Sequence, residues 1–502
     1  MHAGRRPGFK CGPPVPHAES TSDDKKKGNQ MKHLITHSSL ETRRPASRTC
    51  SPGVNTFSRN RRQPSGLCLA VSLISLLLAS QAANADEAGA GGTASADSPA
   101  CLKYDRYNYV GSESPFPSNC ESIAPELGGL RQAMYDAGWN AQLLLTSGLT
   151  YDLKNHDHEP QVYSGQRLSS TSTGSLLLNH DLERYGLPKG SLFTLGGSLA
   201  YSTYRGDGLR AGYLSQFSAR IPFYDGRVVL QLGYYGLAGQ FYGTLLGNNI
   251  AASTLGPSSG ILAQTGVQGF KPSPALDIRF YSKDKRYYNH FGVARSISPD
   301  GLFADSDDNR SGLQFHTKDA RAVFIDEVGY RVEAGPGQKK IWLRGGVIYN
   351  NSKFTRLDEP GRKSSNYGSY AVADLQLTQP DSALPYRGWY VNAYVNQGRN
   401  DVDYLPIAFG ASIYSLAPFE SRPYDLLAFG ISRNQYSNWL KRNAALSGAD
   451  YANATTNLSI SYAYRVRQGV YLQSALIYTD NPTFSPKRGS SLNAYTTLVL
   501  VF

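Results

Sequence analysis

Long hydrophobic runs are missing from most of this chain. Beyond residue 85, no apolar stretch reaches the roughly 20 residues that a membrane-spanning helix needs, so spanning helices are excluded there. The mean hydropathy of the whole chain is −0.39, yet it contains 34 Tyr, 19 Phe and 50 Gly. This mixture is unusual for a large soluble core. It is expected where lipid-facing residues alternate with a wet interior and tyrosine marks the two membrane interfaces.

The first 85 residues have few acidic side chains. They hold 13 Lys and Arg against 4 Asp and Glu, so they carry nine of the chain's twelve net positive charges. Residues 86–502 are therefore close to neutral. The high pI belongs mainly to this N-terminal part and does not indicate a nucleic-acid partner for the rest of the chain.

The N-terminal part ends in the pattern of a secretory signal peptide. Arginines at 59, 61 and 62 precede an apolar run at 67–79, and Ala-Asn-Ala follows at 83–85. This order predicts cleavage after Ala85, with a mature protein that begins at Asp86. The alternative is an uncleaved anchor, but the run is shorter than the ~20 residues of a spanning helix.

Cysteine is scarce, with five in the chain. Three of them precede residue 86, which leaves Cys101 and Cys120 in the exported part. An even pair in an oxidising compartment predicts one disulfide. Closing a loop of this size would contribute about 3 kcal/mol by restricting the unfolded chain. The alternative is two free thiols in a mobile linker.

Groupings of residues that carry out catalysis are also missing. Five histidines follow residue 85, and none stands in a nucleophile elbow or a metal-binding spacing that we recognise. His156 and His158 flank Asp157 in a polar stretch before Pro160, where an exposed loop is a better interpretation than a metal site. Glycine-containing runs follow no phosphate-binding pattern. We therefore predict that the protein is not an enzyme and has no catalytic residues, metal or cofactor.

Residues 139–502 show repeated alternation with a period of two, which indicates β-strands with two different faces. In 389–396, Trp, Val, Ala and Val alternate with Tyr, Asn, Tyr and Asn. The last stretch, 491–502, also alternates, and by itself it would fit a soluble sandwich. If its two faces meet lipid and water, its edge must pair with the first strand. The segments number about sixteen, so we predict an all-β fold, a closed transmembrane antiparallel β-barrel.

These patterns predict three parts of the chain. Residues 1–85 are an N-terminal extension and signal peptide. Residues 86–138 are a periplasmic linker with a short helix at 127–138 that stops at a glycine. Residues 139–502 are the outer-membrane β-barrel.

Charged and aromatic side chains on the polar strand faces are the candidates for lining the pore. A charge on the lipid face near the bilayer midplane costs ~2–4 kcal/mol, which favours the inward choice. The register around Glu327 is ambiguous because Asp326 and Val328 adjoin it. For each residue the alternative is that it solvates the wall and touches no sugar. The candidate pore-lining residues are Asp277, Arg279, Glu327, Arg344, Asp374, Tyr390, Tyr394 and Arg465.

The longest stretch without clean alternation is 238–274, which is rich in Gly, Ser, Thr, Asn and Ala. A loop of this length in a compact domain is usually functional or disordered. Two interpretations stay open: it folds inward and narrows the pore, or it is a disordered external loop.

Several motifs occur in an order that is similar to one known family. They include Gly-Gly-Leu-Arg at 128–131, where Leu127 precedes them in place of a Trp, and Pro-Ala-Leu-Asp-Ile-Arg-Phe at 274–280. Further segments lie at 329–331, 366–374, 403–410, 422–431 and 462–466, and the chain ends on Phe502. Over most of 125–502 the chain resembles the OprB family of carbohydrate-selective porins. The resemblance implies a sixteen-stranded outer-membrane barrel for the diffusion of sugars such as glucose.

The predicted function is passive, carbohydrate-selective diffusion of small sugars across the bacterial outer membrane, after export through the periplasm. The expected partners are small neutral sugars, outer-membrane lipid and the barrel assembly machinery, which would act through the C-terminal strand. A general porin for ions and small solutes and a non-conducting structural barrel are the alternatives. The sequence leaves open the preferred sugar and whether the barrel is monomeric or trimeric.

Overall fold

The computed structural model describes residues 99–108, 118–157, 160–243, 260–269 and 271–502. The chain divides into two units, Met1–Cys50 and Ser51–Phe502, and every described residue belongs to the second. The predicted signal peptide, its cleavage site at Ala85 and the linker at 86–98 therefore lie outside the described residues.

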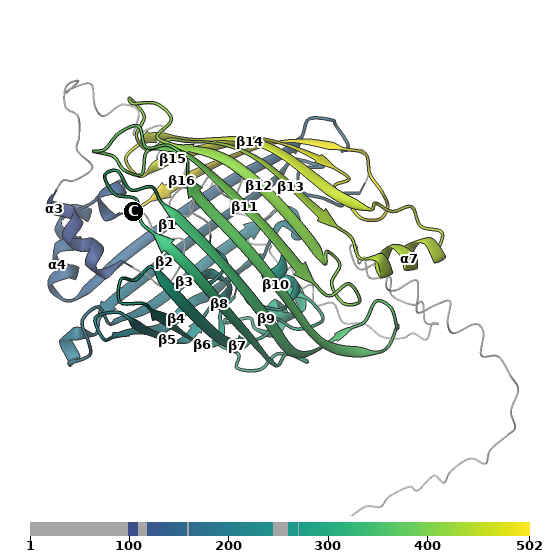
Figure 1. Cartoon of the computed structure of the whole chain (residues 1–502), viewed down its shortest axis with the longest axis horizontal. Coiled ribbons are helices and arrows are strands. Elements are labelled where there is room, and N and C mark those ends of the chain that lie inside the picture. Colours follow the sequence, from purple (N-terminus) through teal and green to yellow (C-terminus); the bar gives the residue numbers. More distant parts are fainter. Residues whose placement is uncertain (1–98, 109–117, 158–159, 244–259, 270) are drawn as a thin grey trace, which may run out of the picture. The chain divides into compact units, whose positions relative to one another are not determined.

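Sixteen antiparallel strands form one closed barrel, in which each strand pairs with its neighbours in the sequence (Figure 1). The predicted fold class and strand number are confirmed. The strands are β1 (Trp139–Asp152), β2 (Ser169–Asp181), β3 (Leu192–Ser202), β4 (Ala211–Phe223), β5 (Val228–Tyr235), β6 (Ser273–Tyr281), β7 (Tyr287–Arg295), β8 (Ala322–Val332), β9 (Ile341–Thr355), β10 (Lys363–Gln376), β11 (Gly388–Gly398), β12 (Ile407–Leu416), β13 (Leu426–Gln435), β14 (Ala454–Arg467), β15 (Val470–Asp480) and β16 (Ser491–Val501).

The first and last strands close the barrel, as the alternation of the final stretch predicts. Their register runs from Leu144 opposite Val501 to Asp152 opposite Asn493. Phe502 extends this pairing by one residue. Its N–H donates to the Leu143 carbonyl at 2.9 Å, and the Leu143 N–H donates to the Phe502 carbonyl at 3.1 Å.

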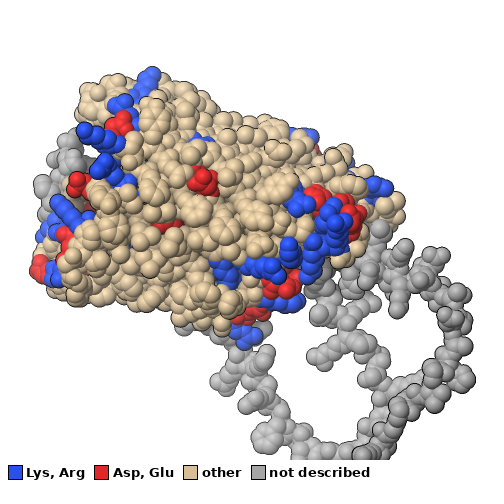
Figure 2. All heavy atoms as spheres, turned by 60° about the horizontal axis from the view of Figure 1, so that its bottom comes forward, with Lys and Arg blue, Asp and Glu red and all other residues tan. Residues whose placement is uncertain are grey.

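Each strand has a buried interior face and an exposed outer face. In β9, Trp342, Arg344 and Ile348 are buried, whereas Leu343 and Val347 are exposed. The outer faces carry mainly Leu, Val, Ile, Phe and Tyr, which suits contact with lipid. Figure 2 shows the result on one side of the barrel, where Lys, Arg, Asp and Glu gather towards the two ends of a largely uncharged surface. Among the described residues, no helix is both long and apolar enough to cross a membrane.

The two ends of the barrel differ in the length of their connections. At one end the links are short, such as Gln468 and Gly469 between β14 and β15. We call this the turn end, and it also holds the C-terminus. At the other, the loop end, the connections are longer and contain α6 (Leu302–Asp308) and α7 (Asn438–Leu446). The longest of these connections, residues 236–272, joins β5 to β6.

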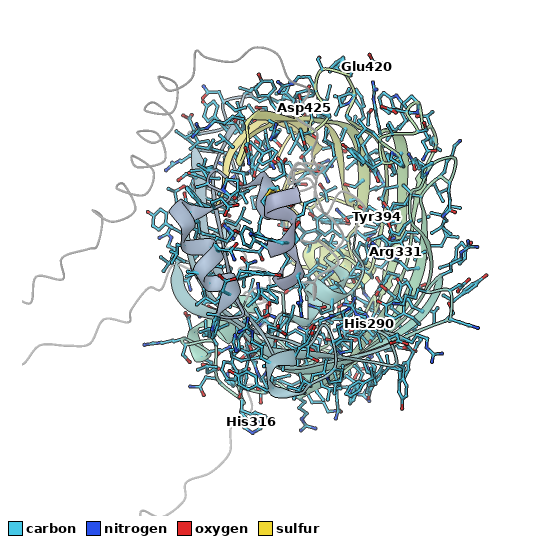
Figure 3. All side chains as sticks on the ribbon, turned by 90° about the vertical axis from the view of Figure 1, so that its left-hand side faces the viewer. His290, His316, Arg331, Tyr394, Glu420 and Asp425 are labelled. Atoms are coloured by element: carbon cyan, nitrogen blue, oxygen red, sulfur yellow. A yellow bond between two sulfur atoms is a disulfide. The ribbon has the colours of Figure 1, made fainter. Side chains whose placement is uncertain are left out.

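A short N-terminal module precedes β1 at the turn end and lies in the foreground of Figure 3. It consists of α3 (Pro99–Leu102), η1 (Lys103–Tyr107), η2 (Asn119–Glu121), η3 (Leu127–Gly129) and α4 (Leu130–Asp136). The α-helix is shorter than the predicted 127–138. It begins only at Leu130 because Gly128 and Gly129 have φ values of +65° and +90°, which an α-helix does not contain.

The module is held together by a disulfide and fixed to the barrel by charged groups. Cys101 and Cys120 form the disulfide, with Cα atoms 5.3 Å apart. Arg131 is 1% exposed, and its Nη1 donates to Asn119 Oδ1 at 2.6 Å and to Asn140 Oδ1 of β1 at 2.9 Å. Glu121 pairs with Arg465 of β14 at 3.1 Å. The Ile123 N–H also donates to the carbonyl of Val501 in β16 at 2.8 Å, so the module contacts β1, β14 and β16 around the closure of the barrel.

Candidate functional site

The described parts of the connection between β5 and β6 lie against the interior face of the barrel wall. We call residues 236–272 the inward segment. Its described parts include η6 (Leu237–Gln240) and α5 (Ile261–Gln264), while 244–259 and 270 lie outside the described residues. Leu237, Phe241, Tyr242, Ile261 and Val267 are buried in one apolar cluster with wall residues of β7 to β10, among them Val323, Ile325, Ile348 and Val372. Of the two interpretations of 238–274, the described parts support the inward one.

A carboxylate on β8 holds the N-terminal part of the segment. Glu327 is 1% exposed and accepts a hydrogen bond from the Tyr242 N–H at 3.0 Å. It also accepts from the hydroxyls of Tyr370 at 2.6 Å and Tyr288 at 2.8 Å. Three donors on one buried carboxylate offset much of the cost of removing its charge from water.

An arginine on β9 holds the next two backbone carbonyls. Arg344 donates to the carbonyl oxygens of Tyr242 and Gly243, and it forms a salt bridge with Asp374 of β10 at 2.7 Å. Both side chains of this pair are fully buried. The guanidinium group also lies 3.7 Å from the ring centre of Trp342. Its planar array of donors thus joins the wall, the segment and an aromatic face at one point.

A third group of contacts surrounds η6. Asp277 of β6 accepts from the Tyr235 hydroxyl at 2.6 Å and lies 2.7 Å from His290 Nε2. The His290 ring stacks on Phe241 at 3.9 Å between ring centres. Arg279 donates to Gln240 Oε1 at 2.7 Å. Figure 3 places His290 low on the barrel wall in this view, across the interior from Asp425.

Amide side chains hold the C-terminal part of the segment at the loop end. Asn350 donates to the Thr265 carbonyl at 2.7 Å and Asn366 donates to the Gln264 carbonyl at 3.1 Å. The Gln264 side chain in turn exchanges two hydrogen bonds with the backbone of Leu405, in the connection between β11 and β12. The segment is therefore tied both to the wall and to a neighbouring loop.

Asp403 stands beneath these amides in the same loop. It is 3% exposed and accepts from Asn366 Nδ2 at 2.7 Å and from the Arg399 N–H at 2.8 Å. Burial raises the pKa of this carboxyl from its ordinary 3.8 to about 6, although the two hydrogen bonds oppose the shift. The folded protein therefore holds this proton more tightly than the unfolded chain between pH 4 and pH 6.

We expect the contribution of Asp403 to stability to be largest at low pH and to be lost as the pH rises through about 6. As the pH rises, this carboxyl loses its proton at a lower pH in the unfolded chain than in the folded protein. The free energy of unfolding therefore falls between about pH 4 and pH 6, by on the order of 3 kcal/mol in total. Unfolding in detergent by urea, followed from pH 4 to pH 8 for the native protein and Asp403→Asn, measures the difference. Two parallel curves across this range would show that Asp403 does not titrate as inferred.

The eight candidate pore-lining residues all lie on interior faces, but most are covered. Arg279, Glu327 and Arg344 contact the inward segment directly. Asp277 holds His290, which stacks on Phe241 of the segment, and Asp374 pairs with Arg344. Tyr390 is buried and stacks on Tyr414 at 5.1 Å. Tyr394 is half-buried beside Tyr242, and Arg465 contacts the N-terminal module. Direct contact of these residues with a permeating solute stays a prediction.

The register at β8 is no longer ambiguous. Glu327 lies inside, and Asp326 lies on the outer face, where Asn289 of β7 donates to its Oδ1 at 2.7 Å. The sequence gives two adjacent carboxylates and no local rule for choosing between them. Pairing of Asp326 with Phe291 and of Glu327 with His290 in β7 decides it.

A second interior surface, for which no candidate residue was named from the sequence, lies across the barrel from β7 to β10. Side chains with hydroxyl groups gather on the interior faces of β1, β2, β3 and β16, beside apolar residues such as Leu144 and Val499. The Thr146 and Thr173 hydroxyls lie 2.5 Å apart, and those of Ser175 and Ser198 lie 3.0 Å apart. The run Ser-Ser-Thr-Ser-Thr-Gly-Ser at 169–175 was a usable signal. We call this surface the hydroxyl wall: Thr146, Thr150, Thr171, Thr173, Ser175, Ser198, Tyr495 and Thr497.

Gly148 allows hydroxyl groups from the two strands beside β1 to approach one another, because it has no side chain of its own. A Cβ on Gly148 would lie 2.7 Å from the Thr497 hydroxyl and 3.4 Å from those of Thr171 and Tyr495. Three hydroxyls from two strands therefore converge at one point. Thr173 remains exposed on this interior face, so the wall is open to water there.

Two opposed surfaces thus lie in the interior. One is the hydroxyl wall. The other, which we call the charged wall, lies behind the inward segment and consists of Asp277, Arg279, Glu327, Arg344 and Asp374. Within the described ranges no group of three or more His, Cys, Asp or Glu side chains is placed to hold a metal ion. A closed transmembrane barrel of sixteen strands with a segment folded into its lumen is the architecture of a porin.

Comparison with known proteins gives the family. The family model of carbohydrate-selective porins, OprB family, matches residues 181–495. The chain belongs to the OprB family, and it is an outer-membrane protein. No curated protein sequence matches the chain.

One solved structure supports the fold, and two others are reported as similar. The high-pH structure of Pseudomonas putida OprB is 18% identical, covers 76% of this chain and 98% of its own, and superposes with a TM-score of 0.60. The low-pH structure of the same protein is 14% identical over 76% and 98%, with a TM-score of 0.48. A mutant of the Rh. blastica porin is 11% identical over 72% and 100%, with a TM-score of 0.42.

Proposed function

We propose that this barrel passes small neutral sugars such as glucose across the outer membrane by passive diffusion, between the inward segment and the hydroxyl wall. The observation that carries this proposal is the pairing of the interior charges. Asp277, Glu327 and Asp374 each accept hydrogen bonds from a histidine, tyrosine or arginine. Glu327 holds the segment directly, whereas Asp277 and Asp374 are paired with wall residues that contact it, and the opposite wall offers uncharged hydroxyls.

Uncharged hydroxyls suit a sugar for a simple reason. A sugar hydroxyl both donates and accepts, and so does the hydroxyl of serine, threonine or tyrosine. A neutral wall also keeps the mean potential in the pore small, so neither sign of ion is strongly favoured. Each contact replaces one that the sugar makes with water, so binding stays weak enough for the sugar to leave.

The inward segment supplies the constriction in this proposal. It projects from β5 and β6 and is fixed to β7 to β11 by groups buried beneath it. Because the backbone of its described parts is held at several points, these parts limit the width of the path at a position that the fold fixes. Tyr394, labelled in the lumen in Figure 3, is half-buried at the edge of this contact.

We expect single-channel conductance in a planar bilayer to fall when millimolar glucose is added, because a bound sugar excludes ions from the constriction. Liposomes containing the protein should also swell faster in a monosaccharide than in a non-sugar solute of equal size. Conductance that is indifferent to every sugar, with no swelling preference, would instead support a general porin for ions and small solutes. A barrel that conducts nothing would support a structural role.

We also propose the route to the membrane. The signal pattern ending at Ala85 supports export through the periplasm, and short connections in such barrels face the periplasm. The turn end, with the N-terminal module and its disulfide, would then lie on the periplasmic side. The C-terminal strand that ends on Phe502 would be the segment recognised by the barrel assembly machinery.

A further inference from the structure

Three connections meet in a second pocket at the loop end, away from the constriction. They are the β3–β4 connection with η5 (Arg205–Asp207), the last residues of the inward segment, and the β7–β8 connection with α6. The pocket has a volume of about 490 Å³. Its lining includes four cationic side chains, Arg205, Arg210, Lys271 and Arg310, with Asp307 and Phe303 beside them.

The charges in this pocket are unequal. Arg205 and Asp307 form a salt bridge of 3.7 Å, and both side chains are mostly exposed, so this pair contributes little. Among the side chains that the structure describes, Arg210, Lys271 and Arg310 form no salt bridge, although Asp305 and Asp307 lie close enough to Lys271 to favour its charged form. Arg210 is held in place by the Ser202 and Thr203 carbonyls, and Arg310 by the Asp307 carbonyl.

Lys271 is the cation of this pocket whose charge is separated most completely from water. It is 2% exposed, and its Nζ donates to the carbonyls of Ser306 at 2.7 Å and Asn309 at 3.0 Å. These carbonyls belong to the last turn of α6 and to the residue that follows it, where a cation is favourably placed. Burial nevertheless lowers the pKa of Lys271, because the charged form is separated from water. An anion bound beside it would favour that charged form.

We propose that this pocket binds a phosphate group, presented either by a phosphorylated glycolipid of the outer leaflet or by a dissolved phosphate compound. Arginine binds phosphate oxygens through two parallel N–H donors, and Arg205 and Arg310 are exposed at the rim where such a group enters. Lysine adds a point charge below it.

The first experiment measures dissolved phosphate. The detergent-solubilised protein is titrated calorimetrically with inorganic phosphate at constant ionic strength, with chloride as the reference anion. Arg205→Gln combined with Arg310→Gln should weaken phosphate binding about tenfold or more, since each removes a charge-assisted hydrogen bond. Arg362→Gln is the matched control, because Arg362 is an equally exposed arginine of another loop-end connection. It should bind as the native protein does.

The second experiment distinguishes the source of the phosphate. Native mass spectrometry counts lipids retained by the protein after mixing with diphosphorylated lipid A or with its dephosphorylated form. Retention of only the phosphorylated form, lost in the double variant, assigns the site to the membrane lipid. Phosphate binding without selective lipid retention assigns it to a dissolved ligand.

Either assignment supports the phosphate pocket. Phosphate and lipid binding that are equal in the native protein and the double variant, or absent from both, would overturn it. Glucose block of conductance should be unchanged in the double variant, because neither arginine contacts the charged wall or the hydroxyl wall. Unchanged glucose block would show that the double variant is folded. It would also allow the phosphate proposal to fail while the proposed sugar diffusion still holds.

Discussion

Replacing Arg344 with methionine is expected to release the inward segment and to raise the ionic conductance of the barrel. Arg344 is fully buried and holds Asp374 and the carbonyls of Tyr242 and Gly243. Methionine fills part of the space but leaves a buried carboxylate and two carbonyls without these donors. Breaking such a pair by removing one partner costs roughly 3–5 kcal/mol. That cost falls on the contact that fixes the segment to the wall.

The conductance change has a defined direction because the segment occupies the lumen. A freed segment leaves a wider path, so ions pass faster and glucose blocks them less. Planar-bilayer recording of both quantities on the same preparation provides the measurement. The control is Arg433→Met, which removes an exposed arginine from the outer face of β13 and should leave both quantities unchanged.

A double variant separates stability from anchoring. Arg344→Met combined with Asp374→Leu removes the uncompensated carboxylate, so thermal stability should recover in part. The carbonyls of Tyr242 and Gly243 remain without their donor, so conductance should stay high. Native conductance and native glucose block in Arg344→Met would show that this arginine does not hold the constriction.

Deleting Phe502 is expected to reduce strongly the amount of assembled barrel. Phe502 closes the last two backbone hydrogen bonds between the first and last strands, with Leu143 as its partner. Losing two such bonds costs about 1–3 kcal/mol, and the strand also loses its apolar aromatic end. Heat-modifiable migration on gels of outer-membrane fractions measures the assembled fraction.

Phe502→Ala divides this effect into two parts. The variant keeps the backbone pairing with Leu143 but loses the aromatic side chain. If assembly fails equally in both variants, the side chain is what matters, as expected for recognition by the assembly machinery. If only the deletion fails, the backbone closure is what matters. Normal insertion of the deletion variant would contradict both explanations.

Much of the fold follows from the sequence because a strand's two faces are a local property. Alternation with a period of two can be read from a few neighbouring residues, and lipid on one side leaves few choices for the other. The pattern in 389–396 therefore places Tyr390 and Tyr394 inside before any partner strand is known. Closure between the first and last strands follows because an open edge in lipid leaves backbone groups unpaired.

The candidate site was only partly predictable, for the opposite reason. Glu327 meets the Tyr242 N–H across 85 residues, and Arg344 meets the Tyr242 carbonyl across 102. Nothing local to these residues indicates that their charges are used to hold a segment rather than to face a solute. The same holds for the hydroxyl wall, whose members come from both ends of the barrel sequence and meet only because the barrel closes.

The sequence by itself therefore determined the strands, their faces, the closed barrel and the polar side chains available inside. Only the tertiary structure decided which of Asp326 and Glu327 faces the interior, that the described parts of 236–272 pack against the inner wall, and which charges are covered as a result. The physical reason is the distance along the chain over which each property is determined. Face selection depends on neighbours two residues apart, whereas burial of a charge depends on donors that the closed barrel brings from distant strands.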